Sequence, residues 1–244
     1  MTSRTLFRFI EPLLIISLLL ALTASSHAQT KRKFFIPGQH AIVFDDRLSA
    51  LREQPEVKAG LKQRLSRGRI VGILGASRNK NGSPFLRVAV SRNVRGWILA
   101  AAIARLGSVA DGEKILSAAA ESKDDLVKAR MARLCADELR LPTIAPKALL
   151  ALGQAAEHAA EKLSRDADRR LGDDLPDGGL SKRDFVLSFN ELDRYNRAGV
   201  TFDYDEMKDR IVYDGAAYRE LLRRYPRSPE AQQAQERLAR LVKE

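Results

Sequence analysis

The sequence predicts an α+β protein, in which a small β-rich part precedes a mostly helical part that contains one β-hairpin. Short apolar runs separated by turn signals occupy the chain up to residue 105. Longer amphipathic segments rich in Ala, Leu, Glu, Lys and Arg follow. The 244 residues suffice for one or two small domains after a leader. We expect a leader at 1–28, a β domain at 29–106 and a helical region at 107–244.

The N-terminal segment, residues 1–28, has the order of a secretory signal peptide. Arg4 and Arg8 precede an apolar run at 13–24, and Ser26-His27-Ala28 then offers a small-x-small cleavage site. The run has about 12 residues, too few for a helix to cross a bilayer core of roughly 30 Å. We therefore expect cleavage rather than an uncleaved anchor. The mature chain would be periplasmic or secreted, without a transmembrane segment.

The β domain is predicted from short strands with turns between them. Residues 86–90 alternate apolar Leu and Val with Arg and Ala, which is typical of a half-buried strand. Asn81-Gly82 is a hairpin-turn signal. Strands at this spacing favour a small barrel or sandwich. The other predicted strands are Ala41 to Phe44, Leu61 to Leu65, Arg69 to Leu74, and the segment around Gly96-Trp97-Ile98.

Residues 41–105 resemble the bacterial SH3 domain family. In that family a strand and a long first loop precede a central strand, a hairpin, and a Gly-Trp strand with a final short turn. The matching segments here are 48–52, 53–58, 66–75, 85–90 and 96–98. The resemblance implies a small SH3-like β-barrel. One departure concerns the first loop, where the family often has Arg-Ser-Gly-Pro and this chain has Arg-Glu-Gln-Pro at 52–55.

Trp97, the only tryptophan, is the centre of the predicted ligand site. Aromatic-lined grooves of SH3 folds dock extended peptides, and Trp with Arg is common hot-spot chemistry. We predict a ligand-binding site of Arg52, Arg95 and Trp97. The alternative is that Trp97 is a core or barrel-end ring.

The helical region is predicted from apolar residues at helical spacing. Gly153 lies inside one of these patterns at a cost of about 1 kcal/mol relative to Ala, which a close helix crossing would explain. A linker is expected at 172–181. The predicted helices are 112–120, 123–139, 146–171, 185–196, 217–224 and one from Pro229, with a β-hairpin of 199–204 and 210–213.

The C-terminal helix pair resembles the tetratricopeptide-like repeats of envelope proteins, including outer-membrane assembly lipoproteins. The resemblance implies a repeat-like scaffold that contacts protein partners. The residues that carry it are Tyr218, Leu221, Leu222, Tyr225-Pro226, Ser228-Pro229, Ala231 and Ala234.

Composition argues against several classes of active site. Cys135 is the only cysteine, so the chain has no intramolecular disulfide, and its helical position predicts a small core residue. His40 and His158 are the only histidines after the leader, too few for a zinc site with one thiol. The sequence lacks G-x-S-x-G, H-E-x-x-H and a Gly-rich phosphate loop. We expect no catalytic residues, no metal and no cofactor.

Positive charge is concentrated in the β domain. Residues 29–105 contain sixteen Lys and Arg against four Asp and Glu, whereas residues 106–244 contain twenty-four against twenty-six. Such asymmetry indicates an anionic partner, or else simply a soluble, self-repelling surface. Nucleic acid is the usual partner of a basic domain, but export argues against it. Cell-wall carboxylates, lipid phosphates and acidic proteins are the better candidates.

These patterns favour an exported, non-enzymatic adaptor of the cell envelope. Its β domain would bind an anionic ligand, either peptidoglycan or a peptide, and its helical region would bind an envelope protein. One alternative is a cell-wall-processing enzyme with an unrecognised site, which a deep pocket around Asp203, Tyr204 and Asp205 would favour. The other is a structural subunit of an outer-membrane assembly. If no such pocket is present, we interpret Asp203 and Asp205 as polar residues at the end of a strand.

Overall fold

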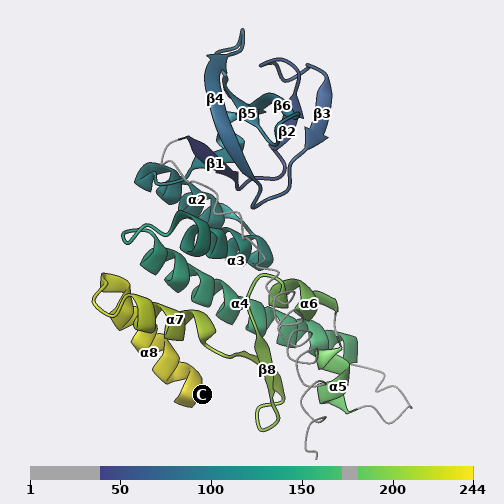
Figure 1. Cartoon of the computed structure of the whole chain (residues 1–244). Helices are drawn as coiled ribbons and strands as arrows, with labels where there is room; N and C mark the ends of the chain where they lie inside the picture. Colours follow the sequence, from purple (N-terminus) through teal and green to yellow (C-terminus); the bar gives the residue numbers. More distant parts are fainter. Residues whose placement is uncertain (1–38, 172–180, 189, 244) are drawn as a thin grey trace, which may run out of the picture. The chain divides into compact units, whose positions relative to one another are not determined.

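The computed structural model describes residues 39–171, 181–188 and 190–243, which form an α+β fold (Figure 1). A seven-stranded antiparallel sheet comes first, helices follow, and a two-stranded sheet lies among them. The predicted α+β class and the single C-terminal hairpin are thus confirmed.

Two predictions concern segments outside this description. The leader at 1–28 lies outside the described residues, and so does the linker expected at 172–181 except for Ser181. Within the described ranges, none of the helices combines the length and the apolar character needed to span a bilayer.

The large sheet has the strand order β3-β2-β6-β5-β4-β1-β7, and it is not closed into a barrel. Every neighbouring pair is antiparallel. The sheet therefore has two edges, β3 and β7. Its strands are β1 (His40–Val43), β2 (Ala50–Arg52), β3 (Leu61–Arg64), β4 (Ile70–Arg78), β5 (Pro84–Ala89), β6 (Arg95–Leu99) and β7 (Ile103–Arg105).

Local hydrogen bonds explain where the strands begin and end. The predicted hairpin turn joins β4 to β5, and the Asn79 carboxamide oxygen accepts from the backbone N–H groups of Asn81 and Ser83 at 3.0 and 2.7 Å. The strand expected from residue 48 starts only at Ala50. The reason is a turn before it, in which the Ser49 hydroxyl donates to the Asp46 carbonyl oxygen at 2.7 Å.

The first helices after the sheet are α2 (Val109–Glu121), α3 (Asp125–Leu134) and α4 (Ala145–Leu171). Side-chain caps set two of the starts: Ser108 accepts from the Asp111 N–H, and Asp124 from the N–H groups of Leu126 and Val127. The helix predicted at 123–139 is confirmed as α3 followed by a π-helical turn, η2 (Cys135–Leu139).

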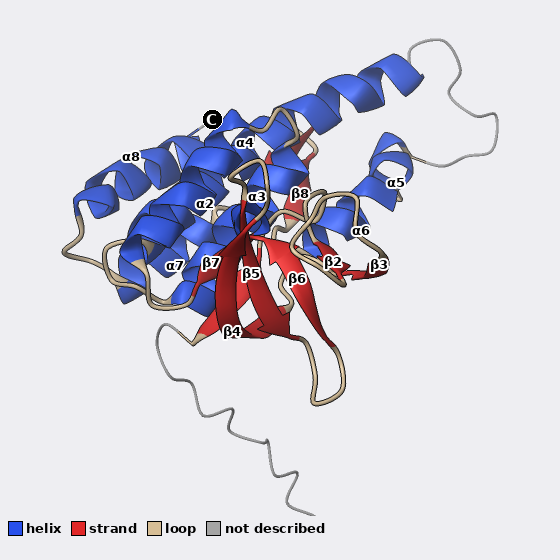
Figure 2. Cartoon of the chain, turned by 90° about the horizontal axis from the view of Figure 1, so that it is seen from above, coloured by secondary structure: helices blue, strands red, loops and turns tan. Residues whose placement is uncertain are grey.

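The C-terminal elements pack on α4. Residues predicted as one helix at 185–196 form two, α5 (Lys182–Leu187) and α6 (Asn190–Asn196). The hairpin is confirmed as β8 (Phe202–Asp205) and β9 (Arg210–Tyr213). Helices α7 (Ala216–Arg224) and α8 (Pro229–Lys243) then pair with each other, and both contact α4 (Figures 1 and 2).

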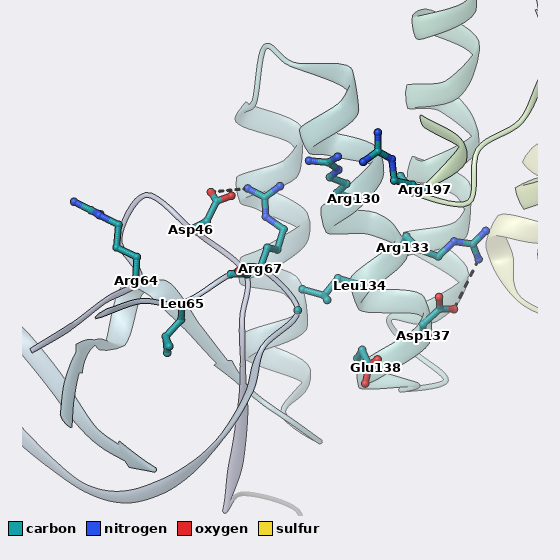
Figure 3. Close-up of a pocket in the computed structure, with 13 residues that line it drawn as sticks. Asp46, Arg64, Leu65, Arg67, Arg130, Arg133, Leu134, Asp137, Glu138 and Arg197 are labelled. Atoms are coloured by element: carbon teal, nitrogen blue, oxygen red, sulfur yellow. Dashed lines mark hydrogen bonds and ion pairs between the residues drawn. The ribbon is translucent and has the colours of Figure 1, made fainter. Parts of the chain in front are cut away.

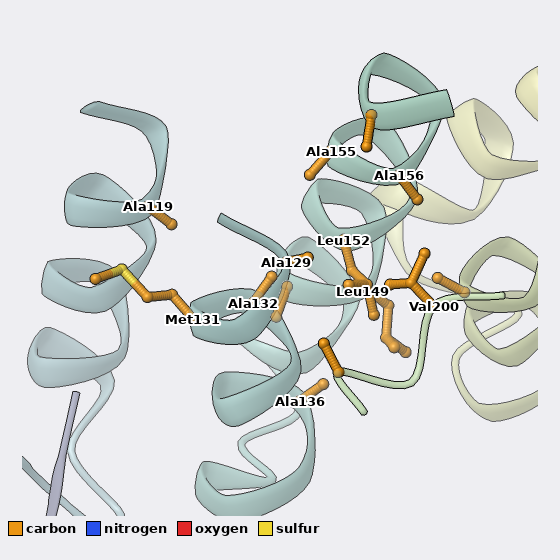
Figure 4. Packing of buried hydrophobic residues seen from close by; sticks show 14 of the residues in the cluster. Ala119, Ala129, Met131, Ala132, Ala136, Leu149, Leu152, Ala155, Ala156 and Val200 are labelled. Carbon is orange, nitrogen blue, oxygen red and sulfur yellow. The ribbon is translucent and has the colours of Figure 1, made fainter. Parts of the chain in front are cut away.

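One apolar core joins the sheet to the helices. Ile42 of β1 and Ala104 of β7 belong to the same buried cluster as the inner faces of α2, α3 and α4. Alanines dominate where α3 meets α4, among them Ala129, Ala132 and Ala156 (Figure 4). Small side chains allow the two helices to approach closely. A second cluster, around Leu51, Val88 and Ile98, fills the interior of the sheet.

The close helix crossing predicted at Gly153 is confirmed. The Tyr218 ring of α7 lies against Gly153, and a Cβ atom there would lie only 2.2 Å from the ring. The Tyr218 hydroxyl donates to Glu157 at 2.6 Å, and Arg237 donates to the other carboxylate oxygen at 2.8 Å. Gly153 thus lets α4, α7 and α8 share one packed junction.

Cys135 is a buried core residue, as its helical position predicts. Burial raises the pKa of its thiol to about 12. The thiolate is the reactive form of cysteine, so the folded chain keeps this thiol unreactive at neutral pH.

Candidate functional site

The predicted site residues Arg52 and Trp97 lie directly opposite each other on neighbouring strands. They pair across β2 and β6, and Trp97 also pairs with Arg87 of β5. Opposite residues of an antiparallel pair project from the same face, so Trp97 lies between two arginines. Leu61 of β3 pairs with Arg52 and is 52% exposed, which extends the row to the sheet edge. We call Leu61, Arg52, Trp97 and Arg87 the Trp97 row.

Arg95 begins β6 two residues before Trp97, so it projects from the same face. Its side chain is exposed, and its carbonyl oxygen accepts from Lys62 Nζ at 3.1 Å. The structure therefore brings Arg52, Arg95 and Trp97 together on one face. Trp97 is half-buried, so part of the residue is exposed to solvent.

The guanidinium of Arg52 also orders the loop between β2 and β3. Nη1 of Arg52 donates to the Ala59 carbonyl oxygen at 2.8 Å. In the same region the Glu53 N–H donates to the Gly60 carbonyl oxygen at 3.0 Å. Arg52 has further donor groups besides Nη1, so it can hold this loop and still meet an anion.

Sequence reasoning missed Arg87 and Lys62 as members of this surface. The signal for Arg87 was present, because the alternation of Leu86 and Val88 with Arg87 places Arg87 on the opposite face. Lys62 gave no such signal, because its approach to Arg95 depends on how β3 folds back along β2.

The structure explains why the residue before Trp97 is a glycine. A Cβ atom on Gly96 would lie 2.7 Å from the Arg52 carbonyl oxygen and 2.8 Å from Leu51 Cγ. Only glycine at position 96 therefore allows β2 to lie this close to β6 beside Trp97.

One acidic residue of the alternative enzyme site, Asp205, stabilises the β8–β9 turn. The Asp205 carboxylate accepts from the N–H groups of Met207 and Lys208 at 3.0 and 3.1 Å. Hydrogen bonds from Lys208 hold the pKa of Asp205 below its usual range. The Tyr204 hydroxyl bonds to Asp209 across the same turn. A cavity of about 460 Å³ next to the hairpin is lined by other residues, among them Glu157, Glu161 and Asp168 of α4 and Lys208, Asp209 and Arg210 of the hairpin. Among the described residues, no three metal-ligand side chains come together.

A second basic surface lies where the sheet meets the helices. A cavity of about 620 Å³ is lined by arginines from β3, the following turn, α3 and the turn after α6 (Figure 3). We call it the arginine cavity. Its arginines are Arg64, Arg67, Arg130, Arg133 and Arg197, and its acids are Asp46, Asp137 and Glu138.

One cavity arginine, Arg133, is fixed by a partner on α7. Its Nη1 donates to Glu220 at 2.8 Å, and Arg224 also pairs with Glu220. Burial raises the pKa of Glu220, but the hydrogen bonds from Arg133 and Arg224 outweigh it, so the pKa lies below its usual value. Glu220 therefore stabilises the fold above the unfolded-state pKa, and this contribution is lost as pH falls through the folded-state pKa.

We expect Glu220→Gln to lower the free energy of unfolding by about 1 kcal/mol at pH 7, because it removes charge-assisted hydrogen bonds that partly reach solvent. The difference from wild type should shrink as pH falls through the lowered folded-state pKa, because wild-type Glu220 is then protonated as well. Urea unfolding from pH 7 to pH 3 measures this. Glu138→Gln, at an exposed position, is the control and should change stability little. A difference for Glu220→Gln that stays constant over this range would contradict the assignment.

Comparisons of the chain with protein-family models, with curated proteins and with solved structures find no significant match.

Proposed function

We propose that the chain is an exported, non-enzymatic binding protein of the cell envelope. Its sheet binds an anionic cell-wall or peptide ligand at the Trp97 row, and its helices contact an envelope protein. The observation that carries this proposal is the pairing of Trp97 with an arginine on each side, Arg52 and Arg87. An aromatic face between two guanidinium groups suits an extended chain that carries carboxylates.

The SH3-like character of the sheet belongs to this proposal. Strand pairing supports it, because β4, β5 and β6 form a meander and β1 pairs with both β4 and the last strand, β7. The short 3₁₀ turn η1 (Ala100–Ala102) follows the Gly-Trp strand, at the place of the family's final short turn. The long connection between β2 and β3 corresponds to the family's first loop.

The repeat-like character of the helices is also part of the proposal. The α7–α8 pair supports it, because Tyr218 and Leu221 of α7 and Ala231 and Ala234 of α8 are all buried in the shared core. The turn between the helices contains Pro226, and Pro229 begins α8. This pair supplies the scaffold that would hold a protein partner.

Co-sedimentation of the purified protein with cell-wall sacculi, at low and at high salt, tests the wall ligand. We expect binding that persists in high salt and weakens roughly tenfold or more in Trp97→Ala, as hot-spot aromatic residues do. Trp97→Phe keeps a ring in the sheet and should bind more tightly than Trp97→Ala. Arg52→Gln and Arg87→Gln should each weaken binding.

Arg92→Gln is the matched control, because Arg92 is exposed in the β5–β6 turn, outside the Trp97 row. Binding that disappears in high salt would reduce the interaction to general charge attraction. No binding to sacculi at either salt concentration would exclude the wall ligand. A peptide ligand at the Trp97 row and a protein ligand of the helices would then be the remaining parts of the proposal.

A further inference from the structure

The arginine cavity collects cationic side chains from segments that are remote in the sequence. Arg64 ends β3, and Arg67 lies in the turn at 66–68, where the Gly68 N–H donates to the Val43 carbonyl oxygen at 2.8 Å. Arg130 lies on α3, whose inner face belongs to the core. Arg197 follows α6. The backbone positions of these arginines are therefore set by the sheet and the helices together.

The acidic groups of the cavity neutralise two of its arginines. Arg67 Nε donates to the Phe44 carbonyl oxygen at 2.8 Å, and its Nη2 lies 3.0 Å from Asp46 Oδ1. Arg133 pairs with Glu220 at 2.8 Å and with Asp137 at 3.7 Å. The partners hold these two arginine side chains in place, so both line the cavity in a fixed position.

The remaining arginines lack acidic partners within the described part of the chain. Arg197 donates from Nε to the Asp193 carbonyl oxygen at 3.2 Å, which leaves its terminal nitrogens for another acceptor. Arg64 is exposed and Arg130 is half-buried, and neither has a hydrogen-bond or ion-pair partner among the described residues. Arg130 matters most here, because its half-buried side chain lines the cavity while its five N–H donors have no protein acceptor among the described residues.

The arrangement of the side chains favours an anion at one side of the cavity. Figure 3 shows the guanidinium groups of Arg67, Arg130 and Arg197 on one side of the cavity. The acid Glu138 lies on the other side. Arg67 is already paired with Asp46, so the unbalanced positive charge on this side comes from Arg130 and Arg197, and neighbouring like charges raise the local positive potential. A bound anion would relieve their mutual repulsion.

We propose that the arginine cavity binds a phosphate group through Arg130, with Arg67 and Arg197 on either side. A carboxylate offers two oxygens in a plane and is satisfied by one guanidinium fork. A phosphate monoester offers three terminal oxygens and close to two negative charges, which suits several guanidinium groups that approach from different segments. The cavity volume of about 620 Å³ exceeds that of a phosphate alone and falls in the range of small-molecule sites.

The same phosphate chemistry is present in free phosphate and in a phosphorylated molecule. Apolar groups of Leu65, Leu134 and Ala198 also line the cavity, so an organic part of such a molecule would meet apolar surface beside the arginines. The arginine cavity shares no residue with the Trp97 row. A result that contradicts phosphate binding in the cavity therefore leaves the proposed binding at the Trp97 row unaffected, and the reverse also holds.

Isothermal titration of the whole protein with inorganic phosphate, with glycerol phosphate and with succinate tests the proposal. Sodium chloride at matched ionic strength controls for screening. We expect saturable one-to-one binding of phosphate that weakens roughly tenfold to a hundredfold in Arg130→Gln, and that also weakens in Arg197→Gln. Arg240→Gln is the matched control, because Arg240 is exposed on α8, away from the cavity, and it should bind as wild type does. Trp97→Ala should also retain phosphate binding.

Tighter binding of glycerol phosphate than of inorganic phosphate would support the site and identify an organic phosphate as its ligand. Equal binding would support it with the free anion as ligand. Phosphate affinity that is the same in wild type, Arg130→Gln and Arg197→Gln would overturn the proposal. So would an absence of saturable binding, or binding of succinate without phosphate. Thermal unfolding of each variant without ligand verifies that every variant is folded when its phosphate affinity is measured.

Discussion

Gly153→Ala is expected to lower the free energy of unfolding by about 2 kcal/mol or more. The new Cβ atom would lie 2.2 Å from Cε1 and 2.4 Å from Cζ of Tyr218. That ring cannot move aside easily, because it is fully buried, packs edge-on against the Tyr213 ring and hydrogen-bonds Glu157. Overpacking of this kind typically costs about 1–3 kcal/mol or more, and the gain in helix propensity of about 1 kcal/mol offsets only part of it. Urea unfolding monitored by circular dichroism measures the change.

A double-mutant cycle separates the clash from other effects of the substitution. In a Tyr218→Ala background, the space occupied by the ring is free, so Gly153→Ala should become neutral or stabilising. If Gly153→Ala were equally destabilising in both backgrounds, contact with Tyr218 would not be the reason for glycine at this position.

The second large effect is expected at Gly96. Gly96→Ala would place a Cβ atom 2.7 Å from the Arg52 carbonyl oxygen, and a backbone oxygen in a strand can withdraw only if the strand moves. We expect a loss of about 2–3 kcal/mol of stability, together with displacement of β2 from β6 and of Arg52 from Trp97. Urea unfolding followed by the fluorescence of Trp97 measures the loss and reports the changed surroundings of the ring.

Gly75→Ala is the matched control in the same sheet. A Cβ atom on Gly75 would meet nothing within 4 Å, so this substitution should be neutral or slightly stabilising. Equal losses for the two variants would contradict a clash with β2 as the reason for glycine at position 96.

The sequence predicted the elements whose signals are local. Alternation of Leu86 and Val88 predicted β5, Asn81-Gly82 predicted the turn before it, and Pro229 predicted the start of α8. Each of these depends on a few neighbouring residues, for which periodicity and turn chemistry are direct physical causes. The end of α5 at Leu187 was missed because the apolar residues of α5 and α6 together continue one helical spacing.

The candidate surfaces depended on tertiary structure to different degrees. Arg95 could be placed near Trp97 from local spacing, because it lies two residues earlier on the same strand, whereas the position of Arg52 depends on which strands are neighbours. The arginine cavity could not be predicted, because Arg64, Arg130 and Arg197 have no common spacing and meet only when α3 packs beside the sheet. Closure of the sheet could not be judged either, since it depends on whether β3 and β7 meet.

The alanine-rich contact between α3 and α4 has a consequence for ligand recognition. Alanine has no side-chain rotamers, so this contact cannot accommodate a larger residue by a change of alanine side-chain conformation, and the helices must shift instead. Arg130 and Arg133 project from that same helix. Inherited variation at a buried alanine such as Ala132 or Ala156 would therefore shift both guanidinium groups as a unit. Selection on binding would then act on core positions that no ligand touches, and a search for ligand contacts alone would overlook them.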